Sequence, residues 1–394
     1  MRRGWAIGFL AAGTLWSVPC RAGDGGFASV DAAASEPFRT ADPSPQGKVF
    51  TPRPELIWPI APNGSRRVES VRVTVAGRET ESRWEGKRGI VARPTQPLAP
   101  GSYDALAEVS FDDGWSGQIR WTFQVAPAPP PAPAPSAAAR ALLEQANALR
   151  ASASLPAMTL DPRLCWAASR HSEYQKKNNV FGHGQSAGTP GYFGGDPQDR
   201  VGACGFGDGV YEGVHLGAES ARGALKSLFY APYHRMAFLQ PGSVAFGGGA
   251  AGEIVTALCA ASKSSAIVTW PAPGQKNVPL GWGGEEIPNP LRLHPVKPGA
   301  SVGTVVSFSH FTPENEAIRV ESAAIFDESG EVVPFYLNTP QNDDELTDTA
   351  FLIPKKPLKP GVRYTVSVLA HGAVHGAALH RQWSFTTEPE PAKR

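Results

Sequence analysis

The segment "APAPPPAPAP", Ala126–Pro135, divides this sequence of 394 residues. Proline fixes φ and has no N–H to donate, so the run favours an extended polyproline spacer of roughly 30 Å, at about 3.1 Å per residue. A stiff spacer separates parts of a chain that fold on their own. We therefore expect a linker over residues 127–137 with a folded region on each side of it.

Two stretches far apart in the chain resemble each other. Residues 96–125 read "QPLAPGSYDALAEVSFDDGWSGQIRWTFQV", and residues 356–387 read "KPLKPGVRYTVSVLAHGAVHGAALHRQWSFTT". Each copy has Leu-x-Pro-Gly, a tyrosine, alternating apolar residues, a polar tip and Trp-x-Phe. Apolar residues at every second position are typical of a strand with one buried face. The copies therefore predict two hairpins of the same kind.

Two small β-sandwich domains follow from these hairpins, over residues 45–126 and 265–388. The second carries some fifty extra residues between Trp270 and Leu358. Both resemble the bacterial immunoglobulin-like modules of surface and secreted proteins, which implies a spacing, presenting or binding role. The histidines in the second hairpin are interpreted as a polar tip rather than a metal site, with His380 on the other face from His371 and His375.

The region after the spacer has a different pattern. Residues 137–152 have apolar residues at helical spacing, and Asp161 is a cap for a second helix that starts at Pro162. A third helix within residues 219–239 should stop near Tyr230, because the following Pro232 disfavours helix before it. Two strands around a glycine-rich turn follow over residues 244–261. This pattern predicts an α+β domain.

The N-terminus has the features of a secretory signal peptide over residues 1–22. Arg2 and Arg3 precede the apolar stretch Gly4–Val18, which is too short to span a bilayer, and a cleavage site follows at Ala22. The alternative is a lipoprotein acylated at Cys20. No later segment is apolar enough to be transmembrane. We expect a secreted, periplasmic or cell-surface protein.

Three cysteines remain after cleavage: Cys165, Cys204 and Cys259. In an oxidising compartment a bridge between Cys165 and Cys204 is plausible, and three unpaired core cysteines are the alternative. Either way Cys259 is expected to be a buried free thiol.

The charge is balanced, with 37 basic and 36 acidic residues and a formal net charge of +1. Nucleic acids and anionic membranes favour a concentrated basic patch. The composition therefore argues against both as the main partner.

The stretch "NNVFGHGQSAG", residues 178–188, places His183 between two glycines after the second helix. Four more segments follow a family order around it. Those segments are "LLEQANALRASASLPAMTLDPRLCWAASRHSEYQ", "DPQDR", "GFGDGVYEG" and "ALKSLFYAPYHRMAFLQPGSVAFGGG". With them, residues 138–262 resemble the CAP superfamily of cysteine-rich secretory, antigen 5 and pathogenesis-related proteins, in its shorter bacterial branch.

This resemblance implies an α-β-α sandwich and a cleft in which His183, Glu212 and His234 converge. The histidines would be ligands of zinc or another divalent cation, and the carboxylate would orient an imidazole or act through water. The sequence departs from the family at Gly213, where asparagine is common, and at Ala231, where plant members have a second glutamate.

Other interpretations of these residues stay open. His183 is otherwise a loop residue, Glu212 a surface carboxylate and His234 a residue of a helix N-terminus. His171 is interpreted as structural and partly buried, and His215 as a solvated residue at a strand end. Arg200 is expected to pair with Asp196 or a backbone carbonyl.

The leading hypothesis for function is a binding module for a hydrophobic, lipid or envelope-derived ligand. The first alternative is a metal-assisted hydrolase of peptide or cell-wall material, in which Glu212 activates water and His183 and His234 hold the metal. The second is an adhesion or surface-scaffold protein with a degenerate site.

Overall fold

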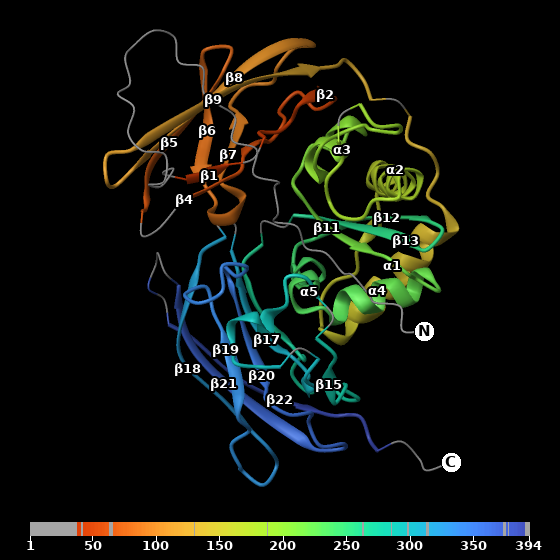
Figure 1. Cartoon of the computed structure of the whole chain (residues 1–394), viewed down its shortest axis with the longest axis vertical. Coiled ribbons are helices and arrows are strands. Elements are labelled where there is room, and N and C mark those ends of the chain that lie inside the picture. The colour runs from red at the N-terminus through yellow and green to blue at the C-terminus, as the bar shows by residue number, and fades with distance from the viewer. Residues whose placement is uncertain are drawn as a thin grey trace. The chain divides into compact units, whose positions relative to one another are not determined.

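A computed structural model describes residues 38–390, except 41, 63–65, 130, 187, 262–263, 285, 298, 313–314, 373–375 and 377 (Figure 1). The expected signal peptide, the alternative acylation site Cys20 and His375 lie outside the described residues. Within the described residues, no helix has both the length and the apolar character that crossing a bilayer requires.

The described chain divides into two compact units. The N-terminal unit holds residues 38–129 together with the short segment 194–207. The C-terminal unit holds residues 131–193 and 208–390, so the CAP-like region and the second β region fold together.

The N-terminal unit is built on a sheet in the order β2-β9-β8-β5-β6-β7-β3, with β1 and β4 paired beside it. Its elements are β1 Phe38–Thr40, β2 Gly47–Val49, β3 Leu56–Trp58, β4 Ile60–Pro62, β5 Val68–Val75, β6 Arg78–Trp84, η1 Gly86–Arg88, β7 Ile90–Pro94, β8 Gly101–Phe111, β9 Ser116–Val125 and α3 Pro197–Ala203. In β9 the predicted alternation is confirmed, because Trp121 and Phe123 are both buried. Tyr103 of β8 stacks on Phe123 with ring centroids 5.8 Å apart.

The buried carboxylate of Asp199 links the helix α3 to the rest of this unit by hydrogen bonds. The side chain of Asp196 caps α3 by accepting from the amide of Asp199 at 2.8 Å. Asp199 accepts from the amide of Gln46 at 2.9 Å and from that of Gly195 at 3.3 Å. Burial, together with the neighbouring Asp196, raises the pKa of Asp199 from its ordinary 3.8 to about 8. Arg200 donates from Nη1 to the carbonyl of Gly195 at 3.5 Å. Of the two pairings expected for Arg200, this is the one with a backbone carbonyl.

The raised pKa makes the attachment of α3 dependent on pH. A folded-state pKa above the unfolded one means that the folded state binds more protons between about pH 4 and pH 8. The free energy of unfolding of the N-terminal unit is therefore expected to fall as the pH rises through that window. The midpoint of urea unfolding of this unit should be lower at pH 8 than at pH 5. In Asp199→Asn, which cannot ionise there, this difference between the two pH values should be smaller, and a difference equal to that of the wild type would contradict the assignment.

The first part of the C-terminal unit contains a sheet in the order β10-β12-β13-β11. Its elements are α1 Ala137–Ser152, β10 Thr159–Leu160, α2 Pro162–Asn178, β11 Val210–His215, α4 Ala221–Tyr230, α5 Pro232–Leu239, β12 Ala245–Ala251 and β13 Ile254–Ala260. The expected helix starts and stops are confirmed. Asp161 caps α2 by accepting from the amide of Arg163, and the chain breaks between α4 and α5 at Ala231, before Pro232.

The glycine run of β12 shows which helix covers which face of the sheet. A Cβ at Gly247 or Gly249 would meet α2, at the backbone of Leu164 and Ser169, whereas one at Gly248 would meet Leu142 of α1. These glycines therefore allow both helices to approach the strand closely. The turn itself is at Gly252, so the glycine run belongs to the strand and not, as the sequence indicated, to the turn.

Helices cover both faces of this sheet (Figure 1). The helix α2 lies on one side of β11, β12 and β13, and α1, α4 and α5 lie on the other. The predicted α-β-α sandwich is therefore confirmed, between β-sheet regions before and after it.

The second β region has sheets in the orders β14-β17-β20-β19, β18-β21-β22 and β15-β16. Its elements are β14 Ala266–Trp270, β15 Gly281–Trp282, η2 Pro290–Leu293, β16 Val302–Gly303, β17 Val306–Phe311, β18 Ile318–Phe326, β19 Phe335–Asn338, β20 Thr349–Pro354, β21 Arg363–Gly372 and β22 Ala378–Thr386. Trp383 and Phe385 are buried on one face, as predicted. His380 lies opposite Leu369, which is two residues from His371 on β21, so His380 and His371 share a face. The expectation that they lie on different faces is wrong, because the turn between β21 and β22 shifts the alternation of faces.

The CAP-like region and the second β region share a hydrophobic core. Trp270 and Phe311 pack in the same buried cluster as the side chains of α1, α4 and α5. The rings of Phe229 and Trp270 meet edge to face with centroids 4.8 Å apart. The two regions therefore stabilise one another and are not independently folding domains.

Cys165, Cys204 and Cys259 are buried. Cys165 and Cys259 are free thiols, so the bridge suggested between Cys165 and Cys204 is wrong. Cys165 lies in α2 of the C-terminal unit, whereas Cys204 follows α3 in the N-terminal unit. Burial raises the pKa of Cys259 to about 12, which makes its thiol unreactive.

Candidate functional site: the His183–Glu212 pair

The loop after α2 brings His183 onto β11. The helix ends where Asn179 takes the left-handed conformation, and Gly182 has a φ of 133° that only glycine adopts readily. The Nδ1 atom of His183 then lies 2.9 Å from Oε1 of Glu212. The Glu212 side chain is 2% exposed and that of His183 is 12% exposed. A buried carboxylate thus holds an imidazole that reaches the surface.

Buried polar residues of α2 hold this loop in place. His171 lies with Nε2 2.9 Å from the carbonyl of Gly182, and Gln185 donates to its Nδ1 at 3.0 Å. Because a carbonyl only accepts, Nε2 of His171 carries the proton and Nδ1 accepts. Gln175 accepts from the amide of Gly182 at 3.0 Å. His171 is therefore structural, as predicted, and it is fully buried rather than partly so.

Gln175 and Gln185 were not among the predicted site residues. The signal for Gln175 was its position four residues after His171, which places both on one side of α2. A glutamine on the buried side of a helix needs hydrogen-bond partners. Gln185 follows His183 by two residues and carries no comparable signal.

His234 lies on the other face of the sheet from Glu212. In the register of the strands, Glu212 is opposite Leu258, and Leu258 is opposite Gly247, which faces α2. The next residue, Gly213, points the other way, and a Cβ there would lie 3.5 Å from Cδ2 of His234. The structure therefore brings His183 and Glu212 together and separates His234 from them by the thickness of the sheet.

The partner of His234 is Glu286, which follows β15 in the second β region. Oε1 of Glu286 lies 2.8 Å from Nδ1 of His234 and accepts from its backbone amide at 3.0 Å. Oε2 accepts from the amide of Tyr233 at 3.2 Å. The N-cap residue of α5, Ala231, has no side chain that can do this. Glu286 therefore caps α5, and both side chains of the pair are fully buried.

His215 shares the sheet face of His234. It is 2% exposed, so the expectation of a solvated residue at the strand end is wrong. Burial and the nearby His234 lower the pKa of His215 from its ordinary 6.5. The residue is buried on the face of β11 that α4 and α5 contact.

The geometry fits a carboxylate that orients the imidazole of His183, but it does not fit a zinc site that uses both histidines. With Glu212 as the acceptor, the Nδ1–H form of His183 is favoured, and Nε2 then carries the lone pair. A site with both His183 and His234 as zinc ligands does not fit, because the sheet lies between them. Among the described residues, no group of three or more His, Cys, Asp or Glu side chains is placed to hold a metal ion.

The chain is similar to one protein family and, more distantly, to several solved structures. The model of the family described as "CAP: Cysteine-rich secretory protein family" matches residues 143–253. An extracellular protein with an SCP domain from Bacillus anthracis is 19% identical, with a TM-score of 0.29, over 42% of this chain and 60% of the Bacillus chain. The fibronectin type III-like modules of Clostridium thermocellum CbhA are 8% identical, with a TM-score of 0.19, over 91% of this chain and 97% of theirs.

Among curated proteins none matches this sequence. The family model, the ordered motifs and the α-β-α sandwich nevertheless coincide on one stretch of the chain. Residues 143–253 are a CAP domain, which lies between a β-sheet region before it and another after it.

Proposed function

We propose that this protein is an exported binding protein whose CAP domain holds an envelope-derived ligand at the imidazole of His183. The observation that carries the proposal is the 2.9 Å contact between His183 and the buried carboxylate of Glu212. The family match supports an extracellular role, since the similar Bacillus protein is extracellular.

The pair has the features of a recognition element. A carboxylate that accepts from Nδ1–H fixes both the tautomer and the direction of the ring. The ring edge then offers Nε2 as an acceptor for an O–H or N–H group of a ligand. Val180, in the same loop, is 43% exposed and adds apolar surface. A ligand with hydroxyl or amide groups beside an apolar part suits this loop.

A divalent cation such as zinc is a second candidate for what His183 holds. Metal-ligating histidines commonly have a carboxylate behind the ring, as His183 has in Glu212. In this arrangement His183 is the protein ligand and His234 is not one.

Hydrolysis is supported less well than binding. A general base must reach the water that it activates. Glu212 is nearly inaccessible and already accepts from His183. If a proton is taken from a substrate, His183 is the group to take it.

Binding by the full-length protein tests the proposal. The probes are purified cell-wall sacculi and phosphatidylglycerol vesicles in co-sedimentation, and zinc in calorimetry. His183→Ala is expected to weaken binding of at least one probe about tenfold, since a hydrogen bond to a charge-supported group contributes about 1.5 kcal/mol. Glu212→Gln, which leaves an acceptor oxygen, should have a smaller effect, and His234→Ala should leave binding at this site intact if it folds.

The control is His371→Ala, which removes an exposed histidine of the second β region. Equal binding by wild type and His183→Ala would place the ligand elsewhere. Binding of none of the probes would favour the adhesion or scaffold role and contradict the proposal. Release of soluble fragments from sacculi, lost in His183→Ala, would favour the hydrolase.

A further inference from the structure

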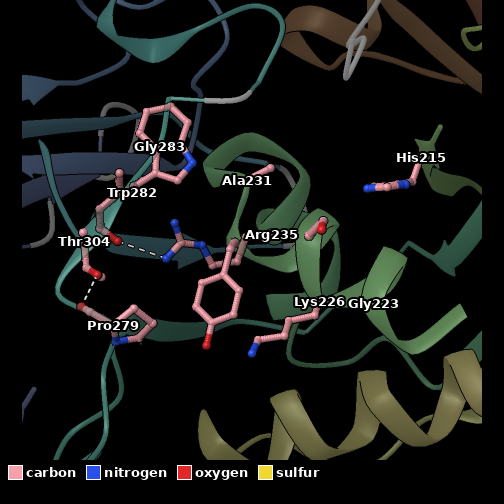
Figure 2. Close-up of a pocket in the computed structure, with 13 residues that line it drawn as sticks. His215, Gly223, Lys226, Ala231, Arg235, Pro279, Trp282, Gly283 and Thr304 are labelled. Atoms are coloured by element: carbon pink, nitrogen blue, oxygen red, sulfur yellow. Dashed lines mark hydrogen bonds between the residues drawn. The ribbon is translucent and has the colours of Figure 1, made fainter. Parts of the chain in front are cut away.

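A pocket of about 410 Å³ lies on the opposite face of the CAP sheet from His183, between the helices α4 and α5 and the second β region. That volume is within the range of small-molecule sites. Figure 2 shows the guanidinium of Arg235 turned toward Trp282 and Thr304, with His215 set apart from them. The lining residues come from α4, α5, β11, β15 and the loops beside β15 and β16.

Arg235 is the unusual residue of this pocket. It is 2% exposed, and its Nη1 donates to the carbonyl of Val305 at 3.0 Å. Its Nε is buried and has no hydrogen-bond partner among the described residues. Its guanidinium carbon is 5.8 Å from the ring centroid of Trp270. A buried cation needs a compensating negative charge, and the described residues that line the pocket with Arg235 do not supply one.

Glu286 does not supply that charge. Glu286 acts on Arg235 electrostatically, but no ion pair within 4.0 Å joins them among the described residues. The carboxylate of Glu286 is already engaged with His234 and with two amides at the start of α5. Burial lowers the pKa of Arg235 to about 10, so the side chain stays charged at neutral pH.

The rest of the lining favours an anion that carries a ring. Lys226 is exposed on α4, and its ammonium lies 5.9 Å from the ring centroid of Tyr230. No Asp or Glu is among the described residues that line the pocket. Trp282 and Tyr230 supply aromatic surface. Aromatic side chains stack on planar or sugar rings, and guanidinium groups pair with carboxylates.

We propose that this pocket binds a small organic carboxylate attached to a ring, with Arg235 and Lys226 facing the carboxylate and Trp282 facing the ring. The proposal is independent of the function of His183. The shared chemistry has two sources, an aromatic acid and a sugar acid, which separate probes distinguish.

Calorimetric titration of the full-length protein tests the pocket. The probes are phenylacetate, glucuronate and the neutral phenylacetamide. One of the two acids is expected to bind with a Kd of about 1 mM or below, and phenylacetamide at least about tenfold more weakly. Lys226→Ala should weaken the binding about fivefold and Trp282→Ala about tenfold. Arg235→Met should abolish it.

Lys176→Ala is the matched control, since Lys176 is an exposed lysine of α2 on the other side of the sheet. Arg235→Met also loses the hydrogen bond to the carbonyl of Val305. If this variant does not fold, Lys226→Ala and Trp282→Ala test the proposal. His183→Ala should bind the acid as wild type does, which separates this site from the first. Absence of binding by both acids, or equal binding by wild type, Lys226→Ala and Trp282→Ala, overturns the proposal.

Discussion

Glu286→Ala is expected to lower the free energy of unfolding of the C-terminal unit by about 3–5 kcal/mol, the usual cost of removing one partner from a buried polar pair. The substitution leaves Nδ1 of His234 and the amides of Tyr233 and His234 without the acceptor that they share. None of these groups can reach water instead, because His234 is fully buried. Unfolding in guanidinium chloride, followed by tryptophan fluorescence, measures the loss.

Two further variants show whether the loss belongs to this contact. Glu286→Gln retains one acceptor oxygen and should lose about half as much. Glu253→Ala removes an exposed acid from the turn after β12 and should change stability by less than about 0.5 kcal/mol. If Glu286→Ala were as stable as Glu253→Ala, the capping role of Glu286 would be wrong.

Gly249→Ala is expected to destabilise the same unit by about 3 kcal/mol or more. A Cβ at this position would lie 2.2 Å from the amide nitrogen of Ser169 and 2.4 Å from the carbonyl carbon of Ala168. Both atoms are backbone, so relief requires α2 to move off the sheet. Such a movement would also break the hydrogen bond of Ser172 to Thr256. The midpoint of thermal unfolding reports the change.

Two other glycines provide the comparison. A Cβ at Gly248 would lie 2.8 Å from Cδ1 of Leu142, a side-chain atom that can shift, and 3.2 Å from the backbone Cα of Ala139. This backbone contact is longer than those at Gly249, so Gly248→Ala should cost less than Gly249→Ala. Gly101 in the N-terminal unit has Cε2 of Tyr103 as its nearest neighbour, at 3.9 Å. Gly101→Ala should therefore be near neutral. A reversed order between Gly248→Ala and Gly249→Ala would contradict the assignment of faces.

Local signals explain why much of the fold was predictable. The helix α1 has the predicted bounds because Ser136 caps it and Leu142, Ala146 and Leu149 recur at helical spacing. The break at Ala231 follows from the next residue, a proline. The glycine run of β12 was predicted to be a turn. A run of glycines is compatible both with a turn and with a strand that two helices approach closely, and the sequence does not distinguish the two.

The site was predictable in part, and for a different reason. The resemblance to the CAP family pointed to His183 and Glu212, which the structure joins directly. It pointed equally to His234, since neither the motif nor the spacing says which face of the sheet a residue occupies. The partner of His234 is 52 residues away in the chain, in a segment that the first β region does not repeat. Such a pairing depends on the tertiary fold and leaves no pattern in the sequence.

The cap that Glu286 places on α5 has a consequence for the order in which the chain is made. The CAP region leaves the ribosome before Trp270, Glu286 and Phe311 have been translated. Domains commonly fold as they emerge, N-terminal parts first. Here α5 has no side-chain cap and the packing surface of Phe229 stays open until a later segment arrives. A fragment that ends at residue 262 therefore corresponds to an incompletely folded intermediate of synthesis, and not to a domain that folds independently.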